Sequence, residues 1–154
     1  MKYLRLHLLF AVTALASIPL TQCNRAEHEF AEIESEGDVT FAKETFEDLA
    51  RGNSEVIDKI DWLMLDSMGE NVGLEYARFV SESEKRQFET AFVTQFAAGF
   101  QRAGGTPSQF TNWRVSYHDD IKTEVAADSG GGTVTIKVTE RDGKERISGI
   151  GFID

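Results

Sequence analysis

The sequence predicts a single α+β domain in which N-terminal helices pack on a curved C-terminal antiparallel sheet of three to four strands. Three observations predict this class. The length of 154 residues suits one ordinary globular domain. Apolar residues recur every three or four positions before Pro107 and every second position after it. Helices followed by strands is the element order of an α+β fold.

Residues 1–22 have the layout of an export signal. Lys2 and Arg5 precede an apolar run that is shorter than the roughly 20 residues a bilayer span needs. The run ends at Leu20-Thr21-Gln22-Cys23, which holds the only cysteine of the chain and resembles the lipobox of bacterial lipoproteins. The resemblance implies that Cys23 is lipidated and anchors the protein in the bacterial cell envelope.

An alternative stays open for this segment. The lipobox has Gly, Ala or Ser before the cysteine, and Gln22 stands there instead. Cleavage after Ala14-Leu15-Ala16 would leave Cys23 unprocessed and the protein secreted. In both cases residues 23–37, which hold five glutamates, are expected to form a solvated acidic tether before the domain at 38–154.

The first half of the domain carries helical patterns. Residues 39–51 predict an amphipathic helix that Gly52 ends. Ser54 is placed to cap a second helix that reaches about Asp66. Residues 74–80 are expected to add one or two helical turns.

Ser81 and Glu84 form a predicted capping box that opens the strongest helix. This helix carries four phenylalanines at intervals of four residues, which places them on one face, and Gly104-Gly105 ends it. The four are Phe88, Phe92, Phe96 and Phe100. They have two interpretations, as core packed on the sheet or as the wall of a hydrophobic ligand cavity.

The second half alternates with the period of strands. Trp113 and Tyr117 belong to an inward-facing series, and His118 is expected on the opposite, solvent face. Asp142-Gly143 is a type I′ hairpin signal that would place Val138 opposite Ile147. A slip in the apolar pattern after Ile147 predicts a bulge near Ser148-Gly149.

A resemblance to a known family follows from three segments. The first helix ends in Leu49-Ala50-Arg51-Gly52-Asn53, a second helix starts at Ser54, and the last hairpin runs from Asp142-Gly143-Lys144 to Gly149-Ile150-Gly151-Phe152. This pattern resembles the nuclear-transport-factor-2-like superfamily of cystatin-like α+β cones. The resemblance implies helices that close over a curved sheet and enclose a pocket. It leaves the activity open, because the superfamily includes isomerases, dehydratases, polyketide cyclases and lipid carriers.

Composition and motifs exclude several function classes. The net charge of −10 argues against a nucleic-acid partner, since phosphate binding needs a basic surface. One cysteine allows no intrachain disulfide, and the sequence has no His/Cys cluster from which to build a zinc site. The sequence also lacks a P-loop, a dinucleotide glycine pattern and a Gly-x-Ser-x-Gly elbow. No metal and no cofactor are therefore expected.

Two functional hypotheses remain. The first is a non-catalytic envelope domain that binds an apolar small molecule or an envelope protein, with the four phenylalanines, Trp113 and Tyr117 as cavity candidates. The second is a small isomerase- or dehydratase-like enzyme that uses His118 or Asp119 in the pocket. If a bend turned Asp119 inward, burial would raise its pKa and make it a candidate base.

Overall fold

The computed structural model describes residues 21–153, with side chains from residue 36 onward. Most of the predicted export signal and the side chain of Cys23 lie outside this range. The helical elements are α1 (Thr21–Arg51), the 3-10 turn η1 (Ser54–Lys59), α2 (Val72–Tyr76), α3 (Glu82–Arg102) and the 3-10 turn η2 (Pro107–Gln109). Among the described helices, none combines the length and apolar character that crossing a membrane requires.

The α+β class is confirmed, but the sheet has more strands than the sequence predicted. Its strands are β1 (Asp66–Ser67), β2 (Glu70–Asn71), β3 (Thr111–His118), β4 (Lys122–Ser129), β5 (Gly132–Arg141) and β6 (Lys144–Ile153). They lie in the order β2-β1-β6-β5-β4-β3, and all pairs are antiparallel except β1 with β6. The sheet is therefore six-stranded and mixed, because the segment around Gly69, expected as a loop, adds two short strands.

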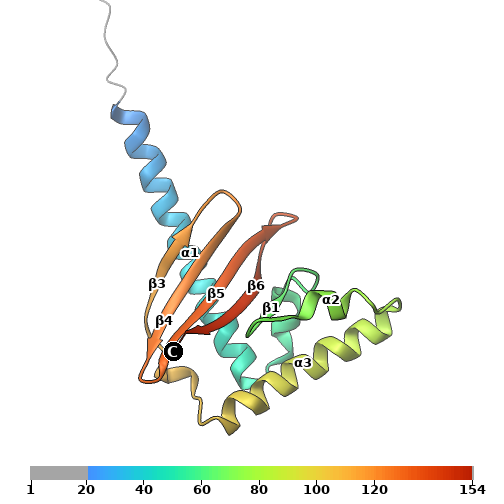
Figure 1. The fold of residues 1–154 in the computed structure, drawn as a ribbon. Helices are drawn as coiled ribbons and strands as arrows, with labels where there is room; N and C mark the ends of the chain where they lie inside the picture. Colours follow the sequence, from blue (N-terminus) through green and yellow to red (C-terminus); the bar gives the residue numbers. More distant parts are fainter. Residues whose placement is uncertain (1–20, 154) are drawn as a thin grey trace, which may run out of the picture.

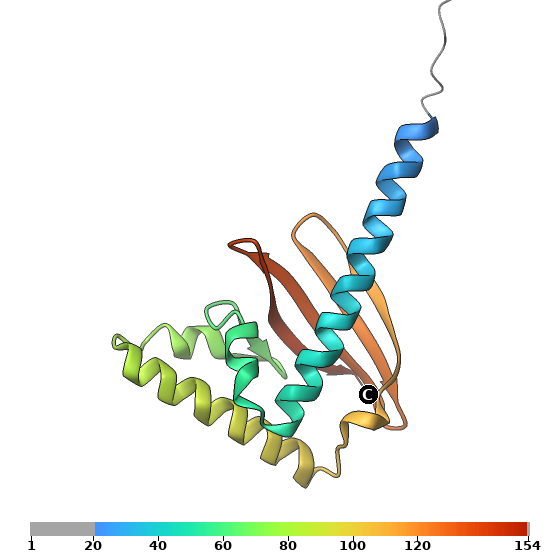
Figure 2. The ribbon, with the colours of Figure 1, turned by 180° about the vertical axis from the view of Figure 1, so that it is seen from behind.

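Helix α1 begins earlier than predicted and crosses one face of the sheet. It starts at Thr21 rather than Val39, so the segment expected as a tether is helical. Glutamate and alanine are good helix formers, and their propensity outweighs the charge repulsion of this segment. Gly52 ends the helix with a φ of +77°, as predicted. Figure 2 shows α1 lying across the sheet and its first turns projecting beyond the strands.

The second helix predicted at Ser54 is only a 3-10 turn. Its N-cap is Asn53, whose side chain accepts a hydrogen bond from the Glu55 amide. The turn ends because the Asp61 amide donates to the Ile147 carbonyl, which draws the chain along β6. Short i→i+3 turns of this kind are common connectors.

The predicted boundaries of α3 are confirmed. Ser81 accepts from the Glu84 amide and the Glu84 carboxylate accepts from the Ser81 amide, which completes the capping box. Gly104 follows the helix with a φ of +78°. Helix α3 lies across the C-terminal end of α1 (Figure 1).

The main core lies between α1 and the facing side of the sheet. Phe46 on α1 is fully buried, and its ring lies 5.1 Å from Phe110, 5.8 Å from Phe100 and 5.9 Å from Trp113. The sheet contributes the alternating residues Val125, Ala127, Val134, Ile136, Val138, Ile147 and Ile150. Edge-to-face ring pairs of this kind are favourable beyond their buried area.

The terminal hairpin has the predicted register. Val138 lies opposite Ile147, and Lys137 lies opposite Gly149, so Ser148 is the extra residue of a bulge. The bulge lets both Ile147 and Ile150 face α1, which explains the slip in the apolar pattern.

Candidate functional site

An apolar groove of about 940 Å³ lies between the C-terminal half of α3 and the ends of β4, β5 and β6. Helix α3 supplies aromatic and small side chains, the β4–β5 turn supplies glycines, and β6 supplies Phe152. The lining residues are Met68, Gln95, Phe96, Gly99, Phe100, Ala103, Gly105, Gln109, Ser129, Gly130, Gly131 and Phe152. We call this site the apolar groove.

The chemistry of the apolar groove favours an uncharged ligand. No lining residue is ionisable, although 27% of the whole chain is charged. Phe152 is 41% exposed and Met68 is 46% exposed, so apolar surface is open to a ligand. The two glutamines offer hydrogen bonds to a polar group, whereas the Ser129 hydroxyl is already bonded to Gly132. The volume falls in the range of small-molecule pockets, roughly 300–1,000 Å³.

The four phenylalanines of α3 divide between the two interpretations. Phe88 and Phe92 pack edge-on against Trp62, with ring centroids 6.3 and 5.5 Å away, and belong to the core. Phe96 and Phe100 pack against Phe46 and also line the apolar groove. Phe96 and Phe100 therefore both pack against the core and line the apolar groove.

The other two aromatic candidates lie elsewhere. Trp113 packs beside Phe46 and lines a separate hollow next to α1. Tyr117 is 48% exposed on the opposite face of the sheet, where its hydroxyl donates to Asp119 and its ring lies 4.8 Å from Lys122 Nζ. Neither side chain lines the apolar groove.

A bulge in β3 decides which way His118 faces. Val115 lies opposite Val125, but Tyr117 lies opposite Glu124, so Ser116 is an extra residue in the β3–β4 ladder. Beyond it the side chains exchange faces. His118 therefore lies opposite the buried Thr123 on the α1 side of the sheet, not on the side that the alternation predicted, but it is exposed to solvent as expected.

His118, Thr123 and Asp38 form a hydrogen-bonded chain. The Thr123 hydroxyl donates to Asp38 Oδ2, and His118 Nδ1 lies 2.8 Å from Thr123 Oγ1. Because the hydroxyl hydrogen points to Asp38, Nδ1 must be the donor to Thr123. The other ring nitrogen, Nε2, is then free to accept a proton and has no hydrogen-bond partner among the described side chains.

Glu145 completes this group, which we call the polar cluster. It lines a hollow of about 120 Å³ together with Asp38, His118 and Thr123. Burial, followed by the charge of Asp38 and a hydrogen bond to it, raises the pKa of Glu145 above its usual value. The polar cluster therefore pairs two carboxyl groups with a histidine that a threonine orients.

Asp119 does not join His118 as a base. It accepts hydrogen bonds from the Ile121 and Lys122 amides and from the Tyr117 hydroxyl. These bonds, the one from Ile121 first, lower the pKa of Asp119. The condition for a raised pKa, an inward turn of Asp119, is not met, since the side chain caps the β3–β4 turn instead of entering a buried site.

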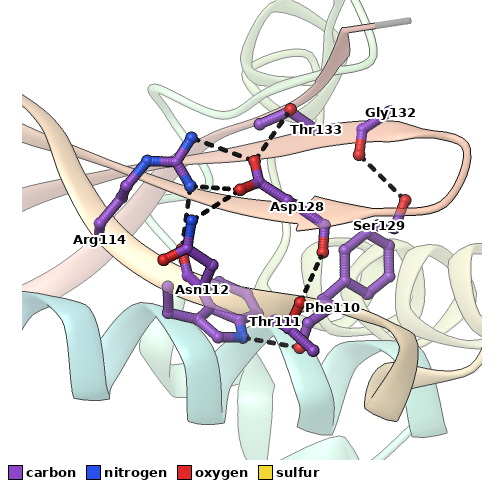
Figure 3. A network of polar contacts seen from close by, with 9 residues as sticks. Phe110, Thr111, Asn112, Arg114, Asp128, Ser129, Gly132 and Thr133 are labelled. Atoms are coloured by element: carbon purple, nitrogen blue, oxygen red, sulfur yellow. Dashed lines mark hydrogen bonds and ion pairs between the residues drawn. The ribbon is translucent and has the colours of Figure 1, made fainter.

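A polar network holds the strand ends beside the apolar groove (Figure 3). Asp128 accepts two bonds from Arg114, at 2.8 and 3.1 Å, one from Asn112 and one from Thr133. Arg114 and then Asn112 are the main causes that lower the pKa of Asp128. The network fixes β3 at Asn112, whose φ of +55° marks a second irregularity in this strand.

Several residues of both sites are not predicted by the sequence pattern. Asp38 lies four residues before Ala42 on the apolar stripe of α1, and a carboxylate in that position was the available signal. No local pattern singles out Thr123 or Glu145. They lie near Asp38 and His118 only because β3 has a bulge at Ser116 and α1 packs on the sheet, and both are features of the tertiary structure. Phe152 was recognised only as part of the last strand.

No side-chain group within residues 36–153 has three or more His, Cys, Asp or Glu arranged to hold a metal ion. The polar cluster has one histidine and two carboxyl groups that bond to protein partners rather than converging on one point. It is suited to moving a proton rather than to binding a metal.

Comparison with known proteins assigns no family to the chain. No family model matches it, and no curated protein or solved structure matches it. Its function is therefore inferred from the apolar groove and the polar cluster.

Proposed function

We propose that this protein is an exported, lipid-anchored envelope protein whose domain binds a neutral, largely apolar small molecule in the apolar groove without chemical change. The observation that carries the proposal is a groove of about 940 Å³ with no ionisable lining residue, in a protein with a net charge of −10. An anionic or cationic ligand would find no counter-charge there, and burying an unpaired charge is costly. A neutral ligand avoids this penalty.

The shape of the apolar groove supports a ligand with an apolar body and one polar group. Phe96, Phe100 and Phe152 provide aromatic surface, and small residues between them leave space. Gln95 and the Nε2 amide group of Gln109 lie in the same lining and can form hydrogen bonds with a ligand, whereas Ser129 already donates to the Gly132 carbonyl. Specificity in such pockets comes from a few polar groups on an apolar wall.

The proposed location rests on the N-terminal segment. Lipidation at Cys23 would attach the chain to a membrane near the start of α1. The 15 residues from 23 to 37 span about 22 Å as a helix. The acidic domain would then stand away from anionic headgroups, which repel it. Membership of the nuclear-transport-factor-2-like superfamily is part of the proposal, and α1 lying across a curved sheet accords with the cone that the resemblance implies.

Native mass spectrometry tests the binding proposal. The full chain, exported in a bacterial host and released with mild detergent, is expected to carry a mass excess that denaturation removes. Titration with the neutral apolar fluorophore N-phenyl-1-naphthylamine supplies a second readout. Phe152→Ala is expected to weaken probe binding about tenfold, whereas Leu74→Ala, also exposed but outside the groove, leaves it unchanged. A bare mass together with equal probe affinity for both variants would exclude the groove as the site.

A second candidate function has one observation in its favour. The Asp38–Thr123–His118 chain leaves Nε2 of His118 as an oriented proton acceptor, which an isomerase or dehydratase needs for removing a proton next to a carbonyl. The adjacent hollow of about 120 Å³ equals roughly four water volumes, so the substrate would be small.

Deuterium exchange distinguishes this candidate. Small ketones and 2-hydroxy acids are incubated with the protein in D₂O, and NMR follows the loss of the C–H signal next to the carbonyl. An enzyme would accelerate exchange, His118→Gln would abolish the acceleration, and Phe152→Ala would retain it. If every compound exchanged its C–H for deuterium at the same rate with and without the protein, this result would count against the function.

A further inference from the structure

Three glycines line the apolar groove although no contact within the protein requires them. They are Gly99 in the middle of α3, and Gly130 and Gly131 in the turn between β4 and β5. None of the three has a positive φ, so their backbone conformation is available to residues with a side chain. A Cβ added at any of them would meet no protein atom within 4 Å. Neither backbone geometry nor internal packing therefore accounts for glycine at these positions.

Two neighbouring glycines show the contrast. Gly104 has a φ of +78°, so the backbone at the end of α3 explains it. At Gly105, which also lines the groove, an added Cβ would lie 2.7 Å from the Phe100 ring, so packing explains it. For the other three glycines of the groove, the explanation lies in the space that they leave open.

Gly99 stands at the centre of the wall that α3 contributes to the groove. Gln95 and Ala103 lie one helical turn before and after it, and Phe96 lies three residues before it; all of them line the groove. Glycine is among the weakest helix formers, so its presence inside a helix of 21 residues lowers the stability of that helix. In return, the main chain of α3 lies bare beside the aromatic rings.

Bare main chain on two separate elements favours a rigid, flat ligand. A flexible chain can bend around a methyl group, whereas a fused ring system cannot and needs a surface free of side chains. A rigid ligand also loses little conformational freedom on binding. Phe96, Phe100 and Phe152 supply aromatic rings that such a ligand can meet face to face or edge to face.

We propose that Gly99, Gly130 and Gly131 select a neutral ligand of two or three fused rings, whose flat face lies against the main chain of α3 and of the β4–β5 turn. This inference rests on the proposed binding function and specifies its ligand class. The two helical turns from Gln95 to Ala103 span about 12 Å, a length that suits such a ring system. Gln95 is placed to bond with one polar group at the edge of the rings.

Displacement of N-phenyl-1-naphthylamine by two alcohols tests the shape of the ligand. 9-Phenanthrol is flat and has three fused rings, and 1-nonanol is a flexible chain of similar hydrophobicity. With the full-length protein, 9-phenanthrol is expected to displace half of the fluorophore at a concentration at least about tenfold lower than 1-nonanol does, because it has no chain to immobilise. Equal concentrations would overturn the ring selection and leave binding in the groove standing. A protein that binds neither the fluorophore nor either alcohol would overturn the binding function itself, and the selection with it.

A matched pair of leucine substitutions on α3 tests the role of Gly99. Gly99→Leu places a side chain in the groove and is expected to weaken 9-phenanthrol binding at least about tenfold, while 1-nonanol, which can bend around it, loses less than about threefold. Ala98→Leu, exposed on the same helix but outside the lining, should leave both affinities unchanged.

Gly130→Leu repeats the test on the exposed β4–β5 turn without changing the helix. It is expected to weaken 9-phenanthrol binding in the same way, and it decides the matter if Gly99→Leu does not fold. Circular dichroism and thermal unfolding identify the folded variants. Wild-type affinity for 9-phenanthrol in the folded leucine variants of the groove would overturn the proposal, even if the fluorophore binds.

Discussion

His118 lies directly opposite Thr123 in the β3–β4 ladder, with its Nδ1 2.8 Å from Thr123 Oγ1. The extra residue Ser116 produces this pairing by exchanging the faces of the residues that follow it. Without the bulge, Tyr117 would face α1 and His118 would face away. One inserted residue therefore determines that β3 places His118, rather than the ring of Tyr117, on the side of the sheet where Asp38 lies.

The hydroxyl of Thr123 is predicted to stabilise the fold. Thr123→Val removes the donor to the buried Asp38 and is expected to lower the free energy of unfolding by about 1–3 kcal/mol. Thr139→Val is the matched control, because the Thr139 hydroxyl is buried and has no hydrogen-bond partner within the described residues. Urea denaturation should show this variant as neutral or stabilised. Equal destabilisation of the two variants would mean that the bond to Asp38 contributes nothing.

The ion pair between Arg141 and Asp61 is predicted to stabilise the fold more than the exposed pair between Arg114 and Asp128. Asp61 is 6% exposed and accepts two bonds from Arg141, at 2.8 and 3.1 Å. Arg141→Met leaves a buried carboxylate unpaired. We therefore expect the free energy of unfolding to fall by an amount near the lower limit of the range of about 3–5 kcal/mol. Arg114→Met breaks a pair that is about 40% exposed on both sides and should cost about 0–1 kcal/mol. Chemical denaturation at pH 7 gives both values, and similar losses would contradict the role of burial.

Much of the fold follows from local signals that the sequence contains. The capping box at Ser81 and Glu84, the terminating Gly52 and Gly104, and the hairpin at Asp142-Gly143 each depend on a few neighbouring residues. The bulge at Ser148 was predictable because it shifts the alternation of apolar residues. These features need no knowledge of distant contacts, which is why the pattern alone predicts them.

The missed features depend on contacts between distant segments. Strands β1 and β2 have two residues each, too few for an alternating pattern, and β1 pairs with β6 more than 80 positions away. The bulge at Ser116 was missed because Tyr117 and His118 are both plausible on either face. Of the residues that form the two sites, the sequence pattern singled out only Phe96, Phe100 and His118. Met68 and Phe152 in the apolar groove, and Asp38 and Glu145 in the polar cluster, come close to them only through tertiary packing.

Alkaline titration is predicted to reveal the bond between Tyr76 and Glu89. The Tyr76 hydroxyl donates to Glu89 at 2.9 Å, and Glu89 is only 7% exposed. Burial first, and then the hydrogen bond and charge of Glu89, raise the pKa of Tyr76 to about 12. Because the folded-state pKa lies above the usual value of 10, the stabilisation is complete below pH 10 and is lost as the pH rises to about 12.

Tyr76→Phe tests this relationship. At pH 7 it removes the donor to a buried carboxylate and is expected to lower the free energy of unfolding by about 1–3 kcal/mol. The difference from wild type should shrink between pH 10 and 12, as the wild type itself loses the bond. Tyr117→Phe is the control, because its bond to Asp119 is exposed, and it should change stability little. A difference that stays constant up to pH 12 would contradict the coupling of Tyr76 ionisation to folding.

Two glycine substitutions are predicted to act in opposite directions. At Gly73 an added Cβ would lie 2.3 Å from the Leu63 carbonyl oxygen, which is backbone and cannot rotate away, so Gly73→Ala should destabilise by about 1–3 kcal/mol or more. At Gly99, inside α3, an added Cβ meets nothing within 4 Å, and Gly99→Ala should stabilise by about 0.5–1 kcal/mol. Thermal and urea unfolding measure both effects.

Gly99 also lines the apolar groove, so the methyl group of Gly99→Ala occupies ligand space while it strengthens the helix. Weaker probe binding in this more stable variant would separate binding from folding, whereas unchanged affinity would place the probe away from α3.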